Sequence, residues 1–301
     1  MRTRTAAASV LGLLILFCLP AVARAQSADA DGDADGDDTP AWVYYERAEE
    51  ASRFDSPERD YAEALRLYSQ ALTVQPVYPE AYVGMARVYR AEGDTTLAER
   101  YYRTALDQAD ALQIPDEEYA LQLELAEMLE QVGRDREFRN ALQRVINHDP
   151  VFAGEGNNGQ RRAMRERLYE SGLNRVLVLY RLDFPQALQA HREYADYLLQ
   201  QDSAEQTDLA VEHLLFSVVE IAGRAVDAII DREFDYQFTS VSDMLLTAQR
   251  YPEVQRYLEE MDFLGLVLRL AQALDEATPD GAAQAAAGIR HEVQATLSLQ
   301  R

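Results

Sequence analysis

The sequence has no lysine and only one cysteine, Cys18, among its 301 residues. One thiol cannot close an intramolecular disulfide. Cys18 also lies in an apolar N-terminal run, so the rest of the chain has no thiol for a nucleophile or a zinc site. The 29 basic residues are therefore all arginines, against 52 acidic residues, and the net charge is −23. Such an excess of negative charge repels nucleic acid and anionic lipid surfaces, so we expect neither as a partner.

Apolar residues make up 48% of the chain, which is enough for a buried core. The length allows one elongated domain or two compact ones. Two origins fit the absence of lysine, a GC-rich genome and a saline habitat that selects acidic surfaces. Composition alone does not separate them.

Residues 1–25 have the layout of a secretory signal. Arg2 and Arg4 precede the apolar run VLGLLILFCL of residues 10–19, and Ala23 and Ala25 supply the small residues before a cleavage site. We therefore predict cleavage after Ala25 and a periplasmic or secreted protein. Cleavage removes three arginines and no acid, which takes the net charge from −23 to −26. The run is short for an uncleaved membrane anchor.

Cys18 offers an alternative, in which it becomes the acylated first residue of a lipoprotein. A lipidation signal places a small residue before the cysteine, but Phe17 stands there, so cleavage after Ala25 is favoured. We predict no membrane span in the mature chain. Its most apolar stretch, residues 211–230, is interrupted by charged residues and indicates a buried amphipathic helix.

The run DADGDADGDD, residues 29–38, resembles the start of a calcium-binding EF-hand loop when the register begins at Asp31. The twelfth position of that loop requires a bidentate glutamate, and here it is Trp42. After signal cleavage, no helix-forming segment precedes the run either. We therefore expect no metal site, and we predict that residues 26–40 form an extended, acidic, disordered linker. Weak calcium association is the alternative.

Two segments match at a spacing of 34 residues: YAEALRLYSQALTVQP at 61–76 and TTLAERYYRTALDQAD at 95–110. The matched pairs are Ala64 with Ala98, Tyr68 with Tyr102, Ala71 with Ala105, and Leu72 with Leu106. This pattern resembles the tetratricopeptide repeat family, whose unit is a 34-residue helix-turn-helix. The resemblance implies an all-α fold in which helical hairpins form a right-handed solenoid.

About three copies of this repeat fit within residues 41–150, which we predict to be a tetratricopeptide-repeat domain. The clearest copy covers residues 81–106, and the next runs from 118 to 150. The first copy opens with a helix over 42–54 and contains an insertion. In such a unit, small alanines let the two helices approach closely, while tyrosines and leucines fill the grooves between repeats.

The second half of the chain begins with a glycine-rich segment. Residues 154–159 (GEGNNG) match a dinucleotide-binding pattern, but no strand precedes them, so we interpret 151–160 as a flexible joint. The remaining residues, 161–301, predict a C-terminal helical domain, formed by degenerate repeats or by a bundle that caps the solenoid. The expected helices cover 161–182, 186–201, 208–232, 241–249, 253–275 and 281–299.

No constellation of catalytic residues is recognisable. The four histidines are scattered, and the chain has no metal-binding His motif, nucleophile elbow or phosphate-binding loop. His213 lies on an otherwise apolar helix and is interpreted as a hydrogen-bonded packing residue. Pairs such as Glu117-Glu118 are adjacent on a helix and therefore point apart. We expect a protein that is not an enzyme and that has no cofactor.

The resemblance to tetratricopeptide repeats implies a groove lined by the first helix of each hairpin. The corresponding positions are Val83, Arg87 and Arg90 in one repeat and Leu123, Glu127 and Glu130 in the next. Arg87 and Arg90 lie three residues apart and share a helix face. They could bind a partner's carboxylate, or they could pair with Glu127 and Glu130 on the neighbouring helix.

These features favour an exported, non-catalytic scaffold that binds a protein or peptide partner in the bacterial cell envelope. The alternative is a small-ligand-binding accessory subunit of a periplasmic transport system. Its pocket would lie between the repeats and the C-terminal helices, lined by aromatic residues such as Tyr169, Tyr180 and Tyr194.

Overall fold

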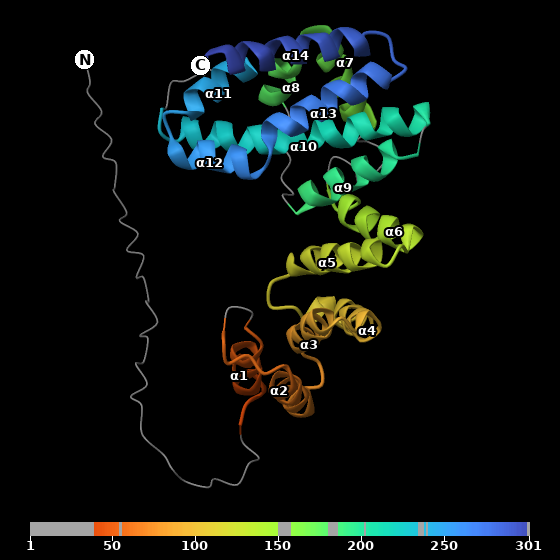
Figure 1. Ribbon diagram of the computed structural model, residues 1–301, viewed down its shortest axis with the longest axis vertical. Helices are drawn as coiled ribbons and strands as arrows, with labels where there is room; N and C mark the ends of the chain where they lie inside the picture. Colours follow the sequence, from red (N-terminus) through yellow and green to blue (C-terminus); the bar gives the residue numbers. More distant parts are fainter. Residues whose placement is uncertain are drawn as a thin grey trace, which may run out of the picture. The chain divides into compact units, whose positions relative to one another are not determined.

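The computed structural model describes residues 39–53, 56–149, 158–179, 186–201, 203–233, 238 and 240–299. Regular structure in these residues is entirely helical, which confirms the all-α prediction (Figure 1). The helices of the first half are α1 (Ala41–Ser52), α2 (Tyr61–Val74), α3 (Pro79–Glu92), α4 (Thr95–Leu106), η1 (Ala109–Ala111), α5 (Glu117–Gln131) and α6 (Asp135–Ile146). The predicted signal (1–25), most of the acidic linker and most of the joint lie outside the described residues.

The helices of the second half are α7 (Asn158–Ser171), α8 (Leu173–Leu179), α9 (Ala187–Leu199), α10 (Ala204–Ile230), α11 (Val241–Ala248), α12 (Pro252–Glu260), α13 (Phe263–Glu276) and α14 (Ala282–Leu299). No described helix combines the length and apolar character needed to cross a membrane.

The first six helices form three hairpins, α1–α2, α3–α4 and α5–α6, and each hairpin packs on the next through α2·α3 and α4·α5 contacts (Figure 1). The residues that match at the 34-residue spacing form the contact surfaces. Ala64 and Ala98 are fully buried, and so is Tyr102, while Tyr68 is 1% exposed. Burying one such aromatic side chain contributes about 1.5–3 kcal/mol. The repeat pattern in the sequence is therefore the packing pattern of the fold.

Corresponding capping residues occur at the helix ends of successive hairpins. Asp60 and Asp94 precede α2 and α4, and each side chain accepts a hydrogen bond, at 3.0 Å, from a backbone N–H of the first turn. Gly93 and Gly133 end α3 and α5 in the left-handed conformation, with φ of 83° and 70°. Glycine adopts that conformation without a Cβ penalty, so each first helix stops where the hairpin must turn.

Hairpin stacking continues past the third repeat. Helix α9 packs on both α5 and α6, just as α3 packs on both α1 and α2, and α9 pairs with α10 as a hairpin. Helices α13 and α14 pair in turn, and α13 packs on α10. The helices α7, α8, α11 and α12 lie between these hairpins in the sequence. This arrangement corresponds to further, divergent hairpins with inserted helices.

Residues Pro40–Arg301 belong to one compact unit. A single hydrophobic cluster extends from Val83 in α3 to Val293 in α14, so the core is continuous across the predicted boundary between 41–150 and 161–301. A second cluster, around Tyr68, fills the first hairpin and its contact with α3. Tyr89 and Tyr101 pack against both clusters and link them.

Two predicted helices are each divided in the structure. The helix expected at 161–182 is broken at Gly172, where a φ of 72° separates α7 from α8. The helix expected at 253–275 is broken at Asp262, with a φ of 49°, between α12 and α13. Apolar periodicity runs through both points because a turn of one or two residues barely shifts the helical phase. The helix predicted at 208–232 also begins earlier, at Ala204.

Candidate functional site

The arginines predicted to line the groove are held by ion pairs to the next hairpin. Arg87 of α3 donates two hydrogen bonds to Glu124 of α5, with N–O distances of 2.6 and 3.1 Å. The Tyr102 hydroxyl donates to the same carboxylate at 2.8 Å. The Arg87 and Glu124 side chains are 41% and 24% exposed, so the pair lies at the surface while it bridges two repeats.

A second pair extends this surface toward α9. Arg90 donates to Glu127 at 2.8 Å, and the Gln189 amide of α9 donates to the other oxygen of Glu127 at 3.0 Å. Gln189 also donates to Glu193 at 2.6 Å. The paired side chains form a row across α3, α5 and α9, each of which is the first helix of its hairpin. The row consists of Arg87, Arg90, Glu124, Glu127 and Gln189. We call this row the first-helix face.

The charges on this face are stabilised by their partners. Burial alone would raise the pKa of Glu124, but the hydrogen bond and charge of Arg87 outweigh it and hold that pKa below its usual value. The same hydrogen bond raises the pKa of Arg87. At the α9 end, burial raises the pKa of Glu193, and the charges of Glu127 and Glu130 add to this effect although Gln189 opposes it. That end of the face therefore favours a cation.

A cavity of about 290 Å³ adjoins the face between α1, α2 and α3, and Arg87 is one of its lining residues. Tyr68 donates from its hydroxyl to Glu49 of α1 at 2.5 Å, which places the phenol on the cavity wall. Gly84 lets the Tyr68 ring lie directly against α3, because a Cβ at this position would collide with the ring. The cavity therefore combines aromatic walls with groups of both charges.

The structure revises the predicted lining of the groove. Val83 and Leu123 are 2% and 8% exposed, so they belong to the core and offer little surface to a partner. Glu130 is exposed, but Arg90 pairs with Glu127. The expected pairing of the arginines with the neighbouring helix is thus right in kind, while the partners are Glu124 and Glu127.

Both ion pairs join residues 37 apart, whereas equivalent positions in the two repeats are 40 apart, as with Arg87 and Glu127. Each arginine therefore contacts a glutamate that lies about one helical turn closer to the N-terminus of α5 than the equivalent position. The offset between α3 and α5 decides which side chains touch, so residues matched by alignment are not those that pair. The sequence does contain an indication of this pairing: Glu124 and Glu127 are three residues apart, as Arg87 and Arg90 are.

A family model of the tetratricopeptide repeat matches residues 58–111, which cover α2, α3 and α4. The chain is a protein that contains tetratricopeptide repeats. A similar protein is an uncharacterized protein of Treponema pallidum (strain Nichols), which is 25% identical over 208 residues. The match covers 68% of this chain and 54% of that relative, so the chain spans about half the relative's length. Tetratricopeptide repeats serve as protein-interaction surfaces, and the family is typically non-catalytic.

His213, interpreted as a packing residue, forms a buried chain of hydrogen bonds with His191 and Asp149 behind the third repeat. The His191 Nε2 atom lies 3.0 Å from Asp149, and its Nδ1 atom lies 2.8 Å from Nδ1 of His213. A carboxylate can only accept, so His191 donates through Nε2 and accepts from His213 through Nδ1. Asp149 and His191 are 0% exposed and His213 is 2% exposed, which fits a structural role.

Of the three aromatic residues expected to line a ligand pocket at this junction, the structure describes Tyr169 and Tyr194. Tyr194 is 7% exposed; its ring packs edge-on against His213, and its hydroxyl accepts from Gln143 at 2.9 Å. Tyr169 is half-buried on α7 beside Gly281, and Tyr180 lies outside the described residues. Tyr194 therefore fills core space in the place where the alternative function required a cavity.

Proposed function

We propose that the chain is an exported, non-catalytic scaffold that binds a protein or peptide partner of the bacterial cell envelope along the first-helix face. The observation that carries this proposal is the row of half-exposed ion pairs that crosses three successive hairpins beside the 290 Å³ cavity. Side chains already fixed by their neighbours lose little conformational entropy when a partner binds, so the row is preorganised.

The charges of the face define the partner it suits. Arg87 and Arg90 are each paired, so a partner's carboxylate would bind by exchanging with Glu124 or Glu127. The α9 end, where Glu193 lies near other carboxylates, suits a lysine or arginine of the partner. A partner segment with both charges therefore complements the face better than a uniformly acidic one.

The non-catalytic part of the proposal rests on where the reactive groups lie. The paired histidines are closed off from solvent, and the hydrogen bonds described above account for their positions. Among the described residues, no group of three or more potential metal ligands is suitably placed for an ion.

The proposal of export rests on residues 1–25, and the intact mass of the processed protein tests it. Cleavage after Ala25 leaves Gln26 first, whereas a retained signal or an acylated Cys18 gives a larger mass.

A charge exchange tests the face without leaving a buried charge unpaired. In the double variant Arg87→Glu with Glu124→Arg, the ion pair is retained but its polarity is reversed. The matched control exchanges Arg66 and Glu63, an exposed pair on α2 with an N–O distance of 2.6 Å. Affinity capture from the native envelope, followed by mass spectrometry, should recover a partner with the wild type and the control.

We expect the Arg87/Glu124 exchange to reduce recovery of that partner at least tenfold, since reversed charges at an interface cost several kcal/mol. Circular dichroism should remain that of the wild type. Equal recovery with all three proteins would place the partner elsewhere and contradict the proposal.

A further inference from the structure

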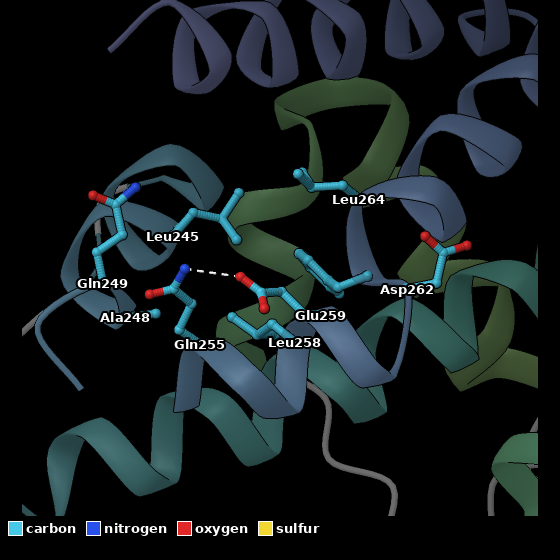
Figure 2. A pocket seen from close by; sticks show the side chains of 9 residues that line it. Leu245, Ala248, Gln249, Gln255, Leu258, Glu259, Asp262 and Leu264 are labelled. Atoms are coloured by element: carbon cyan, nitrogen blue, oxygen red, sulfur yellow. Dashed lines mark hydrogen bonds between the residues drawn. The ribbon is translucent and has the colours of Figure 1, made fainter. Parts of the chain in front are cut away.

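A second cavity lies far along the chain from the first-helix face, among three helices that the repeats do not include. It has a volume of about 620 Å³, within the usual size range of small-ligand sites, and lies among α11, α12 and α13 (Figure 2). Helices α11 and α12 have only eight and nine residues, and sharp turns connect them to each other and to α13. Short helices that change direction twice leave this space unfilled.

The buried lining residues form an apolar floor beneath the open side of the cavity. Leu245 comes from α11, Leu258 from α12 and Leu264 from α13, so each helix contributes a leucine (Figure 2). Ala248 and Phe263 complete the apolar lining and are 2% and 1% exposed. A ligand that covers this apolar surface removes it from water, which makes the free energy of binding more favourable.

The polar part of the lining comprises two glutamines and two acidic residues, all at exposed positions on the rim of the cavity. Glu259 and Asp262 both line the cavity, and none of its nine lining residues is basic. Glu259 accepts a hydrogen bond from Gln255 at 2.8 Å, but neither carboxylate has an ion-pair partner among the residues that the structure describes. By contrast, many carboxylates between helices elsewhere, such as Glu124 and Asp196, are paired with an arginine.

The position of Asp262 is fixed by the backbone. Asp262 adopts a φ of 49° between α12 and α13, and its carboxylate lies against Gly265, where a Cβ would collide with it. Glycine at 265 therefore allows the carboxylate to remain at the start of α13, on the cavity wall. An exposed carboxylate at the edge of an apolar floor, with no ion-pair partner among the described residues, complements a ligand that has both a positive charge and an apolar body.

We propose that the cavity formed by α11, α12 and α13 binds a small organic cation with an apolar body, such as an alkyl ammonium compound. The ammonium group would lie at the exposed rim, beside Glu259 or Asp262, and the alkyl chain would contact Leu245, Leu258 and Leu264. This site is separate from the first-helix face.

Isothermal titration calorimetry of the processed full chain tests this with three probes that share an eight-carbon chain: octyltrimethylammonium, neutral octyl glucoside and anionic octyl sulfate, each below its micelle concentration. Only octyltrimethylammonium should bind saturably with one site. The variant Glu259→Gln with Asp262→Asn keeps the cavity volume, and asparagine tolerates the left-handed backbone. It should bind about tenfold more weakly, since the rim of the cavity loses its negative charge.

The control variant Glu260→Gln with Glu276→Gln removes the same charge from exposed positions that do not line the cavity. It should bind the cation within twofold of the wild type, as should the Arg87/Glu124 exchange. The proposal would be overturned if octyl glucoside bound as tightly as the cation, or if the wild type showed no saturable binding. An equal loss of affinity for the cation in the control variant would also overturn it.

Discussion

At the scale of single residues, Gly84 decides how closely the first two repeats approach. The Tyr68 ring of the preceding repeat lies directly against Gly84. Tyr68 is 1% exposed, so the ring has no free space to move into if a side chain is added at position 84. Burial, together with the hydrogen bond to Glu49, raises the pKa of Tyr68, so the hydroxyl keeps its proton and remains a donor. Because Gly84 has no Cβ, the Tyr68 ring can lie where its hydroxyl donates to Glu49 on the cavity wall.

The substitution Gly84→Ala should destabilise the protein by roughly 1–3 kcal/mol, because overpacking displaces Tyr68 and breaks its hydrogen bond to Glu49. The control Gly223→Ala adds the same methyl group inside α10, where no atom lies within 4 Å of it. Its effect should be neutral or stabilising by up to about 1 kcal/mol, the helix propensity difference. Urea unfolding followed by circular dichroism measures both. An undiminished midpoint for Gly84→Ala would contradict the packing described for Tyr68.

At the scale of helices, the sequence predicted which segments are helical better than it predicted where they break. Spaced alanines and tyrosines identify α2 to α4 because each has one packing role, repeated after 34 residues. The breaks at Gly172 and Asp262 depend on one left-handed residue each, which leaves the apolar periodicity almost intact. The ion pairs of the first-helix face were predicted in kind, but their partners depend on how adjacent helices are offset, which alignment of repeats does not contain.

The helices α9 and α10 are joined to the end of the third repeat by the buried chain from Asp149 through His191 to His213. Burial lowers the pKa of both histidines, although the hydrogen bond to Asp149 partly offsets this for His191, and His191 and Arg161 lower that of His213 further. The unfolded chain, with histidines near pKa 6.5, thus binds protons that the folded chain does not. Stability is full above about pH 6.5 and falls as the pH drops below it.

We expect the free energy of unfolding in urea to decrease between about pH 7.5 and about pH 5.5, a range above the titration of ordinary carboxylates. His213→Phe should remove much of that decrease, while costing roughly 1–3 kcal/mol at neutral pH because His191 loses its partner. His291→Gln, at an exposed position on α14, should retain the decrease. A wild type whose stability is the same at both pH values would contradict the arrangement of this cluster.

At the scale of the whole molecule, the described chain is a series of hairpins around a core that continues from α3 to α14. The first helices α3, α5 and α9 carry the row of charged pairs, and the inserted helices α11 and α12 help to build a separate cavity. The packing residues that define the repeat are buried and unavailable to a partner. The proposed docking site therefore consists of residues between them, which differ from one repeat to the next.

The first-helix face is the proposed docking site of a partner. Hydrogen–deuterium exchange of the full processed chain, with and without the captured partner, tests the claim that a partner docks there. We predict that the partner slows exchange in α3, α5 and α9, whose residues form the face, and leaves α2, α4 and α6 unchanged. Protection confined to α2, α4 and α6, or to α11–α13, would contradict the claim.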